Sequence, residues 1–233
     1  MKKVGFIGGC DKTDWIIYIA KMLTMVQKNV LVIDATIMQK ARYVIPTITP
    51  TVSYITTYEG MDVAIGFKQL QDVISYLGKS AVTELEYDYI LVDVDTALAL
   101  ENMGLEDSYK SYFATTMDTY SIKRGLESIQ NLKQPIELTR ILFTKQQSKE
   151  ELEYINYLAT NLPVKWDEKI IYFPFEKGDQ TAIFENQRVE KIRLKNLTEE
   201  YRTGVIQITE QLLEGMDPSE LKKVIRMLER GAY

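Results

Sequence analysis

An apolar run close to the N-terminus leads directly into a short loop and then into a second, longer apolar run. The first run covers residues 4–7, the loop reads GGCDKTD at residues 8–14, and the second run covers residues 15–26. A buried strand joined by such a loop to a helix is an arrangement in which backbone N–H groups at the helix N-terminus bind phosphate. The start of the chain therefore predicts a strand-loop-helix unit of an α/β protein.

This loop keeps only part of the phosphate-binding pattern G-x-x-x-x-G-K-[ST]. In that pattern the glycines let the backbone approach phosphate, the lysine reaches it, and the hydroxyl binds Mg²⁺. Lys12 and Thr13 are present, but Phe6 and Asp11 occupy the two glycine positions. Two like charges about 4 Å apart repel by roughly 4 kcal/mol at an effective dielectric near 20, so the Asp11 carboxylate opposes phosphate unless it turns away. A side chain at this position also restricts the backbone if the loop needs a positive φ.

The composition of the 233 residues is that of an ordinary globular protein, with 45% apolar and 26% charged residues. The net charge of −5 argues against a protein that binds nucleic acid over its whole surface. The chain has no histidine, which excludes histidine acid-base chemistry and histidine metal sites, and its single cysteine, Cys10, excludes an intramolecular disulfide. Apolar runs are too short for a signal peptide or a membrane span. We expect a cytoplasmic protein.

Short runs rich in β-branched residues alternate with amphipathic stretches, which is the pattern of βαβ units around a parallel sheet. Strands are predicted at residues 4–7, 29–34, 54–58, 61–67, 87–93, 112–116, 140–144 and 169–173. Helices are predicted at residues 15–26, 68–77, 121–132, 149–161, 198–213 and 218–230. The fold class is therefore α/β, with three layers: a mostly parallel, twisted sheet with helices on both faces. We expect a main domain at residues 1–216 and a C-terminal amphipathic helix at residues 217–233.

Several segments, taken in order over nearly the whole chain, resemble the ParA/MinD branch of P-loop ATPases. Residues 7–14 (IGGCDKTD) correspond to its loop K-G-G-x-G-K-T-[ST], and residues 34–36 (DAT) to its acidic switch D-x-D. Residues 89–93 (YILVD) correspond to its Walker-B strand, although VDT follows where D-x-P-P is usual. Residues 114–121 are similar to the next strand-to-helix turn, and residues 170–187 to the final strand and the loop that lines adenine.

The resemblance implies that the chain has the P-loop fold of this family and binds ATP and Mg²⁺ at the loop. The residues that it assigns to the nucleotide are Gly8, Gly9, Cys10, Asp11, Lys12, Thr13, Asp14 and Pro174. The residues that it assigns to the metal are Thr13, Asp34 and Asp93.

Three departures from the family pattern weaken the case for ATP turnover. The signature lysine, which reaches the nucleotide of a partner subunit, is replaced by Ile7, so this position cannot supply a charge in trans. Asp11 replaces a loop glycine, and Thr36 replaces the second carboxylate of the switch. We therefore expect binding of ATP and Mg²⁺ to be weak or absent and no residue of the chain to be catalytic.

Each candidate residue also has a purely structural interpretation. Lys12 contacts phosphate, or else pairs with Asp11 or Asp14. Asp93 holds Mg²⁺ through water, or else accepts N–H groups at the end of its strand. Asp34 orients a water molecule, or else forms a turn. Cys10, beside a helix N-terminus, is either a reactive thiol or, as we favour, a small buried loop residue.

Two basic segments suggest surfaces for partners. Residues 188–195 (RVEKIRLK) carry four positive charges against one negative, typical of a solvated face, with a protein or DNA contact as the alternative. The final helix at residues 218–230 has an apolar face flanked by lysine and arginine. It docks on its own domain, contacts a protein partner, or lies on a membrane surface, and its lack of aromatic residues favours protein contact.

These observations predict an atypical member of the family that helps to localise or assemble a cellular machine, such as one for pilus formation, secretion, division or partition, with little or no ATP turnover. We expect the chain to form a homodimer without nucleotide and to bind an unidentified protein partner. We expect it in the cytoplasm, including the membrane surface or a cell pole. One rival hypothesis is a slow but genuine ATPase in plasmid or chromosome partition. Another is a scaffold that binds no nucleotide.

Overall fold

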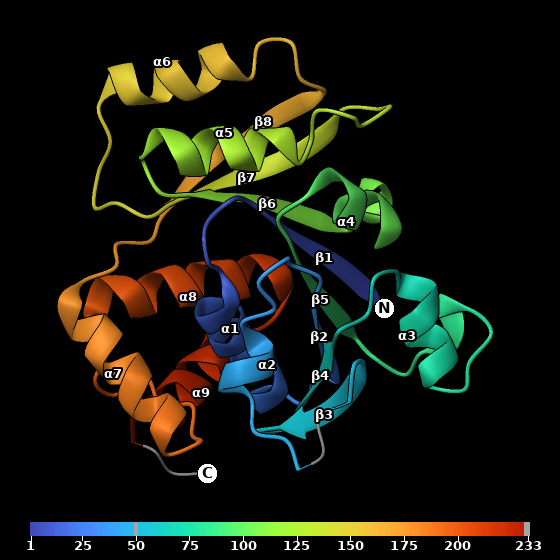
Figure 1. Ribbon diagram of the computed structural model, residues 1–233. Coiled ribbons are helices and arrows are strands. Elements are labelled where there is room, and N and C mark those ends of the chain that lie inside the picture. The colour runs from blue at the N-terminus through green and yellow to red at the C-terminus, as the bar shows by residue number, and fades with distance from the viewer. Residues whose placement is uncertain (49–50, 231–233) are drawn as a thin grey trace.

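The computed structural model describes residues 1–48 and 51–230, and within these residues a single eight-stranded sheet forms the centre of the protein (Figure 1). The strand order is β3-β4-β2-β5-β1-β6-β7-β8. Neighbouring strands are parallel, except that β3 is antiparallel to β4. Strand β5, the most apolar run of the sequence, lies between β2 and β1 inside the sheet, as predicted.

The strands are β1 (Lys2–Ile7), β2 (Val30–Asp34), β3 (Tyr54–Tyr58), β4 (Met61–Ile65), β5 (Tyr89–Val94), β6 (Lys110–Thr115), β7 (Ile136–Leu142) and β8 (Val164–Tyr172). The helices are α1 (Thr13–Met25), α2 (Ala41–Val44), α3 (Leu70–Tyr76), α4 (Ala97–Asn102), α5 (Thr119–Glu127), α6 (Lys149–Leu158), α7 (Lys177–Arg188), α8 (Glu199–Leu212) and α9 (Pro218–Arg230). Short 3₁₀ turns follow α3 and α4.

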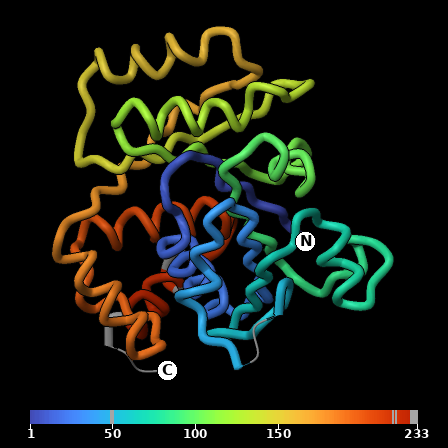
Figure 2. Tube along the Cα trace, viewed as in Figure 1, coloured from blue at the N-terminus to red at the C-terminus, as the bar shows by residue number. Residues whose placement is uncertain are grey.

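The sheet separates two hydrophobic cores, because successive side chains of a strand point to opposite faces. In β5, Leu91 belongs to a core shared with side chains of α1, α7, α8 and α9. Its neighbours Ile90 and Val92 belong to a second core, shared with side chains of α3, α4, α5 and α6. Figures 1 and 2 show the two groups of helices on opposite sides of the sheet. The predicted three-layer α/β class is confirmed.

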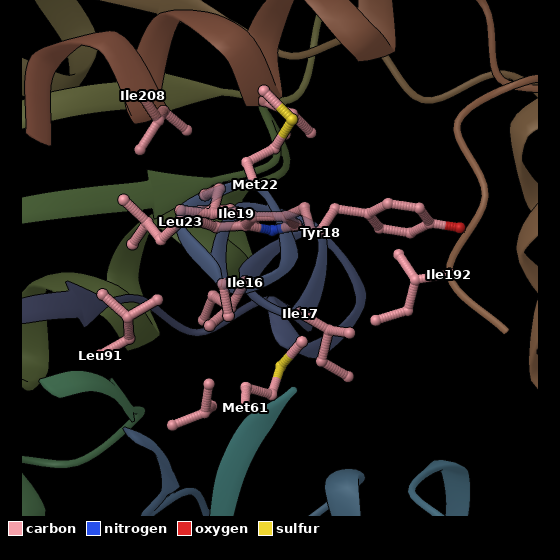
Figure 3. Close-up of a cluster of buried hydrophobic side chains, with 14 of the residues drawn as sticks. Ile16, Ile17, Tyr18, Ile19, Met22, Leu23, Met61, Leu91, Ile192 and Ile208 are labelled. Atoms are coloured by element: carbon pink, nitrogen blue, oxygen red, sulfur yellow. The ribbon is translucent and has the colours of Figure 1, made fainter. Parts of the chain in front are cut away.

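Helix α1 is the centre of the first core. Its side chains Ile16, Ile19 and Leu23 are fully or almost fully buried. Figure 3 shows them in the same cluster as Leu91 of β5 and Ile208 of α8. Burial of each such side chain contributes about 1.5–3 kcal/mol to folding, so the helix is held firmly on the sheet. This position fixes the loop that joins β1 to α1.

Several elements differ from the prediction, and the largest differences in strand bounds lie in the second half of the chain. Strand β7 begins at Ile136 rather than at residue 140, and β8 begins at Val164 rather than at residue 169. The early part of β8 is an edge strand of mixed polarity, and such strands give a weak sequence signal. Helix α4 was not expected from the sequence. Residues 177–188, which the resemblance treated as part of a loop, form helix α7 instead.

Helix α9 packs on its own domain. Its side chains Leu221, Val224 and Leu228 are buried in the same core as α1, whereas Lys222, Lys223 and Arg226 do not enter that core. Of the three alternatives for this helix, the conformation described here is the docked one. No helix among the described residues is long and apolar enough to cross a membrane.

Candidate functional site

The candidate site lies at the carboxyl end of β1, where ligands of open α/β sheets bind. The loop leaves the sheet between β5 and β6, and the Gly8 N–H continues the strand ladder by donating to Val94 O at 3.2 Å. Helix α1 then begins at Thr13. The predicted strand-loop-helix unit is therefore present, with the helix N-terminus directed at the loop.

Packing, rather than an unusual backbone conformation, explains the two glycines of this loop. A Cβ atom on Gly8 would lie 2.1 Å from the carbonyl oxygen of Ala114 in β6, and one on Gly9 would lie 2.7 Å from Cβ of Arg124 in α5. Neither glycine is among the described residues with positive φ, and the same is true of Asp11. Asp11 therefore does not strain the backbone, because its φ is not positive.

Lys12 turns its ammonium group back into its own loop. Its Nζ donates to Gly8 O at 2.8 Å and to Cys10 O at 3.0 Å, and lies 3.0 Å from Oδ1 of Asp93. These contacts provide an acceptor for each of the three N–H groups of a lysine. Lys12 is thus paired, but with Asp93 rather than with Asp11 or Asp14.

The Lys12–Asp93 pair is almost completely buried, with 1% and 2% of the two residues exposed. Burial raises the pKa of Asp93 to about 7, a rise that the ammonium of Lys12 opposes and neighbouring Asp34 supports. Burial, the largest single effect, lowers the pKa of Lys12, but the charge and hydrogen bond of Asp93, together with neighbouring acidic groups, outweigh it and raise the pKa, so Lys12 remains protonated. Oδ2 of Asp93 has no hydrogen-bond partner among the described residues.

Asp11 does not turn away from the loop. Its Oδ1 accepts the backbone N–H of Thr13 at 3.1 Å, one of the N–H groups at the start of α1 that would otherwise face a phosphate. Its Oδ2 lies 2.6 Å from Nζ of Lys40, and the same Nζ lies 2.5 Å from Oδ2 of Asp14. We call Asp11, Asp14 and Lys40 the Lys40 clamp.

Lys40 is a site residue that the sequence did not reveal. It lies in the segment after β2, far from Asp11 and Asp14 along the chain, and is only half-buried. Burial by itself lowers the pKa of Lys40, but Asp14 and Asp11 outweigh it and raise the pKa. The one available signal was electrostatic: two carboxylates in one short loop need a nearby positive charge. That signal does not say which lysine supplies the charge.

Asp34 at the end of β2 organises the segment that carries Lys40. Its Oδ1 accepts the N–H and the hydroxyl of Thr36 at 3.1 and 2.6 Å, and its Oδ2 accepts the N–H of Ala41 at 3.0 Å. In the sheet Asp34 lies directly opposite Asp93. The geometry is that of the turn-forming alternative, and the role of Asp34 as a metal ligand stays a prediction.

Two cavities lie on either side of the Lys40 clamp. The acidic cavity has a volume of about 270 Å³ and is lined by Gly9, Cys10, Asp11, Lys12, Thr13, Thr36, Met38, Lys40, Tyr43, Asp93 and Asp95. The aromatic cavity has a volume of about 510 Å³ and is lined by Cys10, Asp11, Asp14, Trp15, Lys40, Thr116, Phe143, Phe175, Gln180, Ile183, Phe184 and Tyr201. Cys10, Asp11 and Lys40 line both cavities, so the Asp11–Lys40 ion pair borders each of them.

The structure brings together most of the predicted site residues. Those of the loop, residues 9–14, line one cavity or the other, and Asp93 lines the acidic cavity. Pro174 is buried after β8, and the aromatic cavity is lined by its neighbour Phe175 instead. The described residues contain no group of three or more histidine, cysteine, aspartate or glutamate side chains that could hold a metal ion. The assignments to nucleotide and metal stay predictions.

Two other residues of the loop are placed by the structure. The thiol of Cys10 lies 3.4 Å from Ala114 O, and burial raises its pKa to about 11, so the group is protonated at neutral pH. This favours the small loop residue over the reactive thiol. Ile7 is fully buried in the second core, which also contains Phe113. The side chain of Ile7 therefore packs inside its own protomer and is not available for contact with a partner subunit.

Among solved structures, the cell division protein MinD of Aquifex aeolicus, in its complex with MinC, superimposes with a TM-score of 0.58 at 15% sequence identity, covering 94% of this chain and 98% of that one. A plasmid partition protein of Borrelia burgdorferi bound to AMPPNP gives 0.58 at 13% identity, covering 91% and 99%. A Cyanothece McdA variant in complex with ATP gives 0.54 at 16% identity, covering 91% and 96%.

No family model matches the chain, and no curated protein sequence matches it. The likeness is therefore one of fold, and it extends over nearly the full length of each neighbour. The parallel sheet, the loop after β1 and the site at the carboxyl edge of the sheet agree with it. The chain has the P-loop fold of the ParA/MinD type.

Proposed function

We propose that this protein is a ParA/MinD-like positioning or assembly factor that turns over little or no ATP. The observation that carries the proposal is the state of the loop, whose charged groups are engaged by the protein itself. Lys12 pairs with Asp93, and Asp11 accepts the N–H of Thr13 while pairing with Lys40. The similar structures include a cell division protein and a plasmid partition protein, which supports a role in positioning.

Catalysis of phosphoryl transfer requires positive charge around the transferred group. Ile7 occupies the position from which a lysine would reach a partner's nucleotide, and its side chain is buried. Thr36, where a second switch carboxylate would stand, donates its hydroxyl to Asp34. Both features support very slow turnover.

ATP with Mg²⁺ is the cofactor that the fold suggests, and two of the similar proteins were solved with AMPPNP or ATP. In this chain the adenine of ATP would lie in the aromatic cavity, beside Phe175 and Phe184. The phosphates would lie near the Lys40 clamp and the acidic cavity. Thr13 and Asp93 are the side chains that would face Mg²⁺ there. Bound nucleotide would supply the energy and the contacts of a switch between two subunits. Because phosphates there would meet the carboxylate of Asp11 and compete with the carboxylates for Lys40, we expect weak binding.

The proposed partners are a second copy of the chain and an unidentified protein. Exposed apolar side chains concentrate in the segment after β2, where Ile37, Met38, Tyr43, Ile48 and Val52 are all largely exposed. We propose that these side chains contribute to an interaction surface, the usual role of a contiguous exposed apolar patch. A subunit bound to this segment would lie next to the candidate site, since Met38 and Tyr43 also line the acidic cavity. The docked α9 leaves Lys222, Lys223 and Arg226 for contact with a partner or a membrane surface.

Steady-state hydrolysis of Mg-ATP, measured beside calorimetric binding of Mg-ATP, tests the proposal. The wild type and a Lys12→Ala variant should hydrolyse ATP at the same background rate, with weak binding in the wild type. Hydrolysis at the rate of an active ATPase that disappears in Lys12→Ala would show that the slow-ATPase alternative, or a fully active enzyme, is correct. No binding at millimolar Mg-ATP would favour the scaffold.

A further inference from the structure

The charges around the acidic cavity are unfavourable for a polyanion. Three carboxylates, Asp11, Asp93 and Asp95, line it against two ammonium groups, Lys12 and Lys40. Asp34 lies directly behind, opposite Asp93 in the sheet. A phosphate group placed here would meet more negative than positive charge at short range, where repulsion is strong.

Both ammonium groups of the cavity already have anionic partners. Lys12 has Asp93 and two carbonyl oxygens, and Lys40 has Asp11 and Asp14. A new anion would therefore compete with contacts that the protein makes internally. The charged donors of the cavity are engaged.

One hydrogen-bond acceptor of the cavity, in contrast, lacks a partner. Asp93 is 2% exposed and lines the cavity. Its Oδ1 is engaged through the ion pair with Lys12, whereas its Oδ2 has neither an ion-pair nor a hydrogen-bond partner among the described residues. A buried carboxylate oxygen in this state costs free energy until a donor reaches it. What the cavity lacks is a donor, and a charged donor gives the strongest hydrogen bond to a carboxylate.

The rim of the cavity is apolar. Met38 and Tyr43 line it, and both are largely exposed, at 78% and 81%. An aliphatic stem can pack along a methionine side chain, and a cation is attracted to the face of a tyrosine ring. The rim therefore suits a ligand with a positive end and an apolar stem.

We propose that the acidic cavity binds an organic cation, a primary ammonium or guanidinium group on an aliphatic stem, with the charged end at Oδ2 of Asp93 and the stem between Met38 and Tyr43. This goes beyond the proposed positioning role, which does not depend on it. Mg²⁺ is the weaker alternative, because both oxygens of Asp34 are already hydrogen-bonded and the described residues contain no cluster of three or more acidic, cysteine or histidine ligands.

Two sources can supply this chemistry: a lysine or arginine side chain of a protein partner, or a small free diamine. The experiment is calorimetric titration of the full chain with N-acetyl-arginine amide and with cadaverine. The neutral isostere N-acetyl-citrulline amide is the matched control ligand. Arginine amide should bind at least about tenfold more tightly than citrulline amide, since a hydrogen bond between charged groups is worth more than a neutral one. Tighter binding of arginine amide than of cadaverine identifies a protein side chain as the source, and the reverse order identifies a diamine.

Variants locate the binding site. Asp93→Asn should weaken arginine amide binding by about tenfold or more. Because this variant leaves Lys12 buried without its partner, the double variant Lys12→Met with Asp93→Asn serves as a second test and should show the same loss. Tyr43→Ala, at an exposed position, should weaken binding about two- to fivefold. Asp72→Asn, an exposed carboxylate of α3 outside the cavity, should change nothing.

Two results would overturn the proposal. One is equal affinity for arginine amide and citrulline amide, which would show that charge is not recognised. The other is unchanged affinity in the double variant and in Tyr43→Ala, which would place the bound cation elsewhere. ATP hydrolysis assays are independent of both results, so failure here leaves the proposed positioning role unaffected.

Discussion

The ammonium group of Lys12 lies 3.0 Å from the carboxylate of Asp93, and both side chains are buried at the edge of the sheet. The pair joins the loop after β1 to the end of β5, two segments separated by about eighty positions of sequence. The two opposite charges neutralise each other within the protein. The contacts of Lys12 with Asp93, Gly8 and Cys10 hold the loop in the conformation described here.

Removing one member of this pair should be more damaging than removing both. Lys12→Met leaves a buried carboxylate without its partner and should lower the free energy of unfolding by roughly 3–5 kcal/mol. Adding Asp93→Asn should restore most of this loss, because the uncompensated charge is gone. Urea denaturation of the wild type, Lys12→Met, Asp93→Asn and the double variant measures these free energies. Lys40→Met is the control, since its partly exposed pairs should contribute only about 1 kcal/mol or less each. Simple additivity of the two buried substitutions would contradict this interpretation.

Asp11→Gly should raise the affinity for Mg-ATP by an order of magnitude or more. The substitution removes a carboxylate that repels phosphate, frees the N–H of Thr13, and takes one partner from Lys40. Calorimetry measures the affinity. Asp11→Asn, which keeps the side-chain shape without the charge, is the matched control and should fall between the wild type and Asp11→Gly. Equal affinity of the wild type and Asp11→Gly would mean that the loop already binds phosphate in its present form.

The protein should form a homodimer in the absence of nucleotide. Ile7 carries no charge that could bridge two subunits through a nucleotide, and its side chain is buried within its own protomer. Pairing must therefore depend on other contacts, such as those of the exposed apolar segment after β2. A stable dimer should bury on the order of 1,600 Å². Light scattering over a concentration series of nucleotide-free protein measures the mass. A constant mass near 26.9 kDa that doubles only with Mg-ATP would show that nucleotide controls pairing after all.

Gly8→Ala should destabilise the protein although it adds only a methyl group. The new Cβ would lie 2.1 Å from Ala114 O, so the loop or β6 must shift, at a cost of about 1–3 kcal/mol. Gly178→Ala in α7 is the matched control, because a Cβ there meets no atom within 4 Å. That variant should be neutral or stabilising by up to about 1 kcal/mol. Thermal or urea unfolding compares them, and equal stability of both variants would exclude close packing as the reason for Gly8.

The layered fold could be predicted from the sequence because strand and helix periodicities are strong in the first half of the chain. Residues 30–34 and 89–93 are apolar runs that end in an aspartate, and both lie in buried strands. Edge strand β8 and helix α7 were harder, since their burial is partial and their sequences are mixed. Partial burial weakens the very pattern from which elements are predicted.

The position of the candidate site could be predicted from the sequence, but the pairing of its side chains could not. The loop and Asp93 follow from local motifs, whereas the pairing of Lys12 with Asp93 rather than with Asp11 depends on distances across the sheet. Lys40 reaches Asp11 and Asp14 only because Asp34 holds the turn that begins at Thr36. Contacts between segments far apart in sequence have no periodic signal, so the structure was needed to find them.

A loop held in shape by its own charges has a consequence for the protein inside a cell. A protein that binds a nucleotide only in its folded state gains stability with the logarithm of the ratio between the nucleotide concentration and the dissociation constant. This chain, with Lys12 and Asp93 already joined, should gain little from nucleotide. Its folded population should therefore stay the same in starved and in well-fed cells.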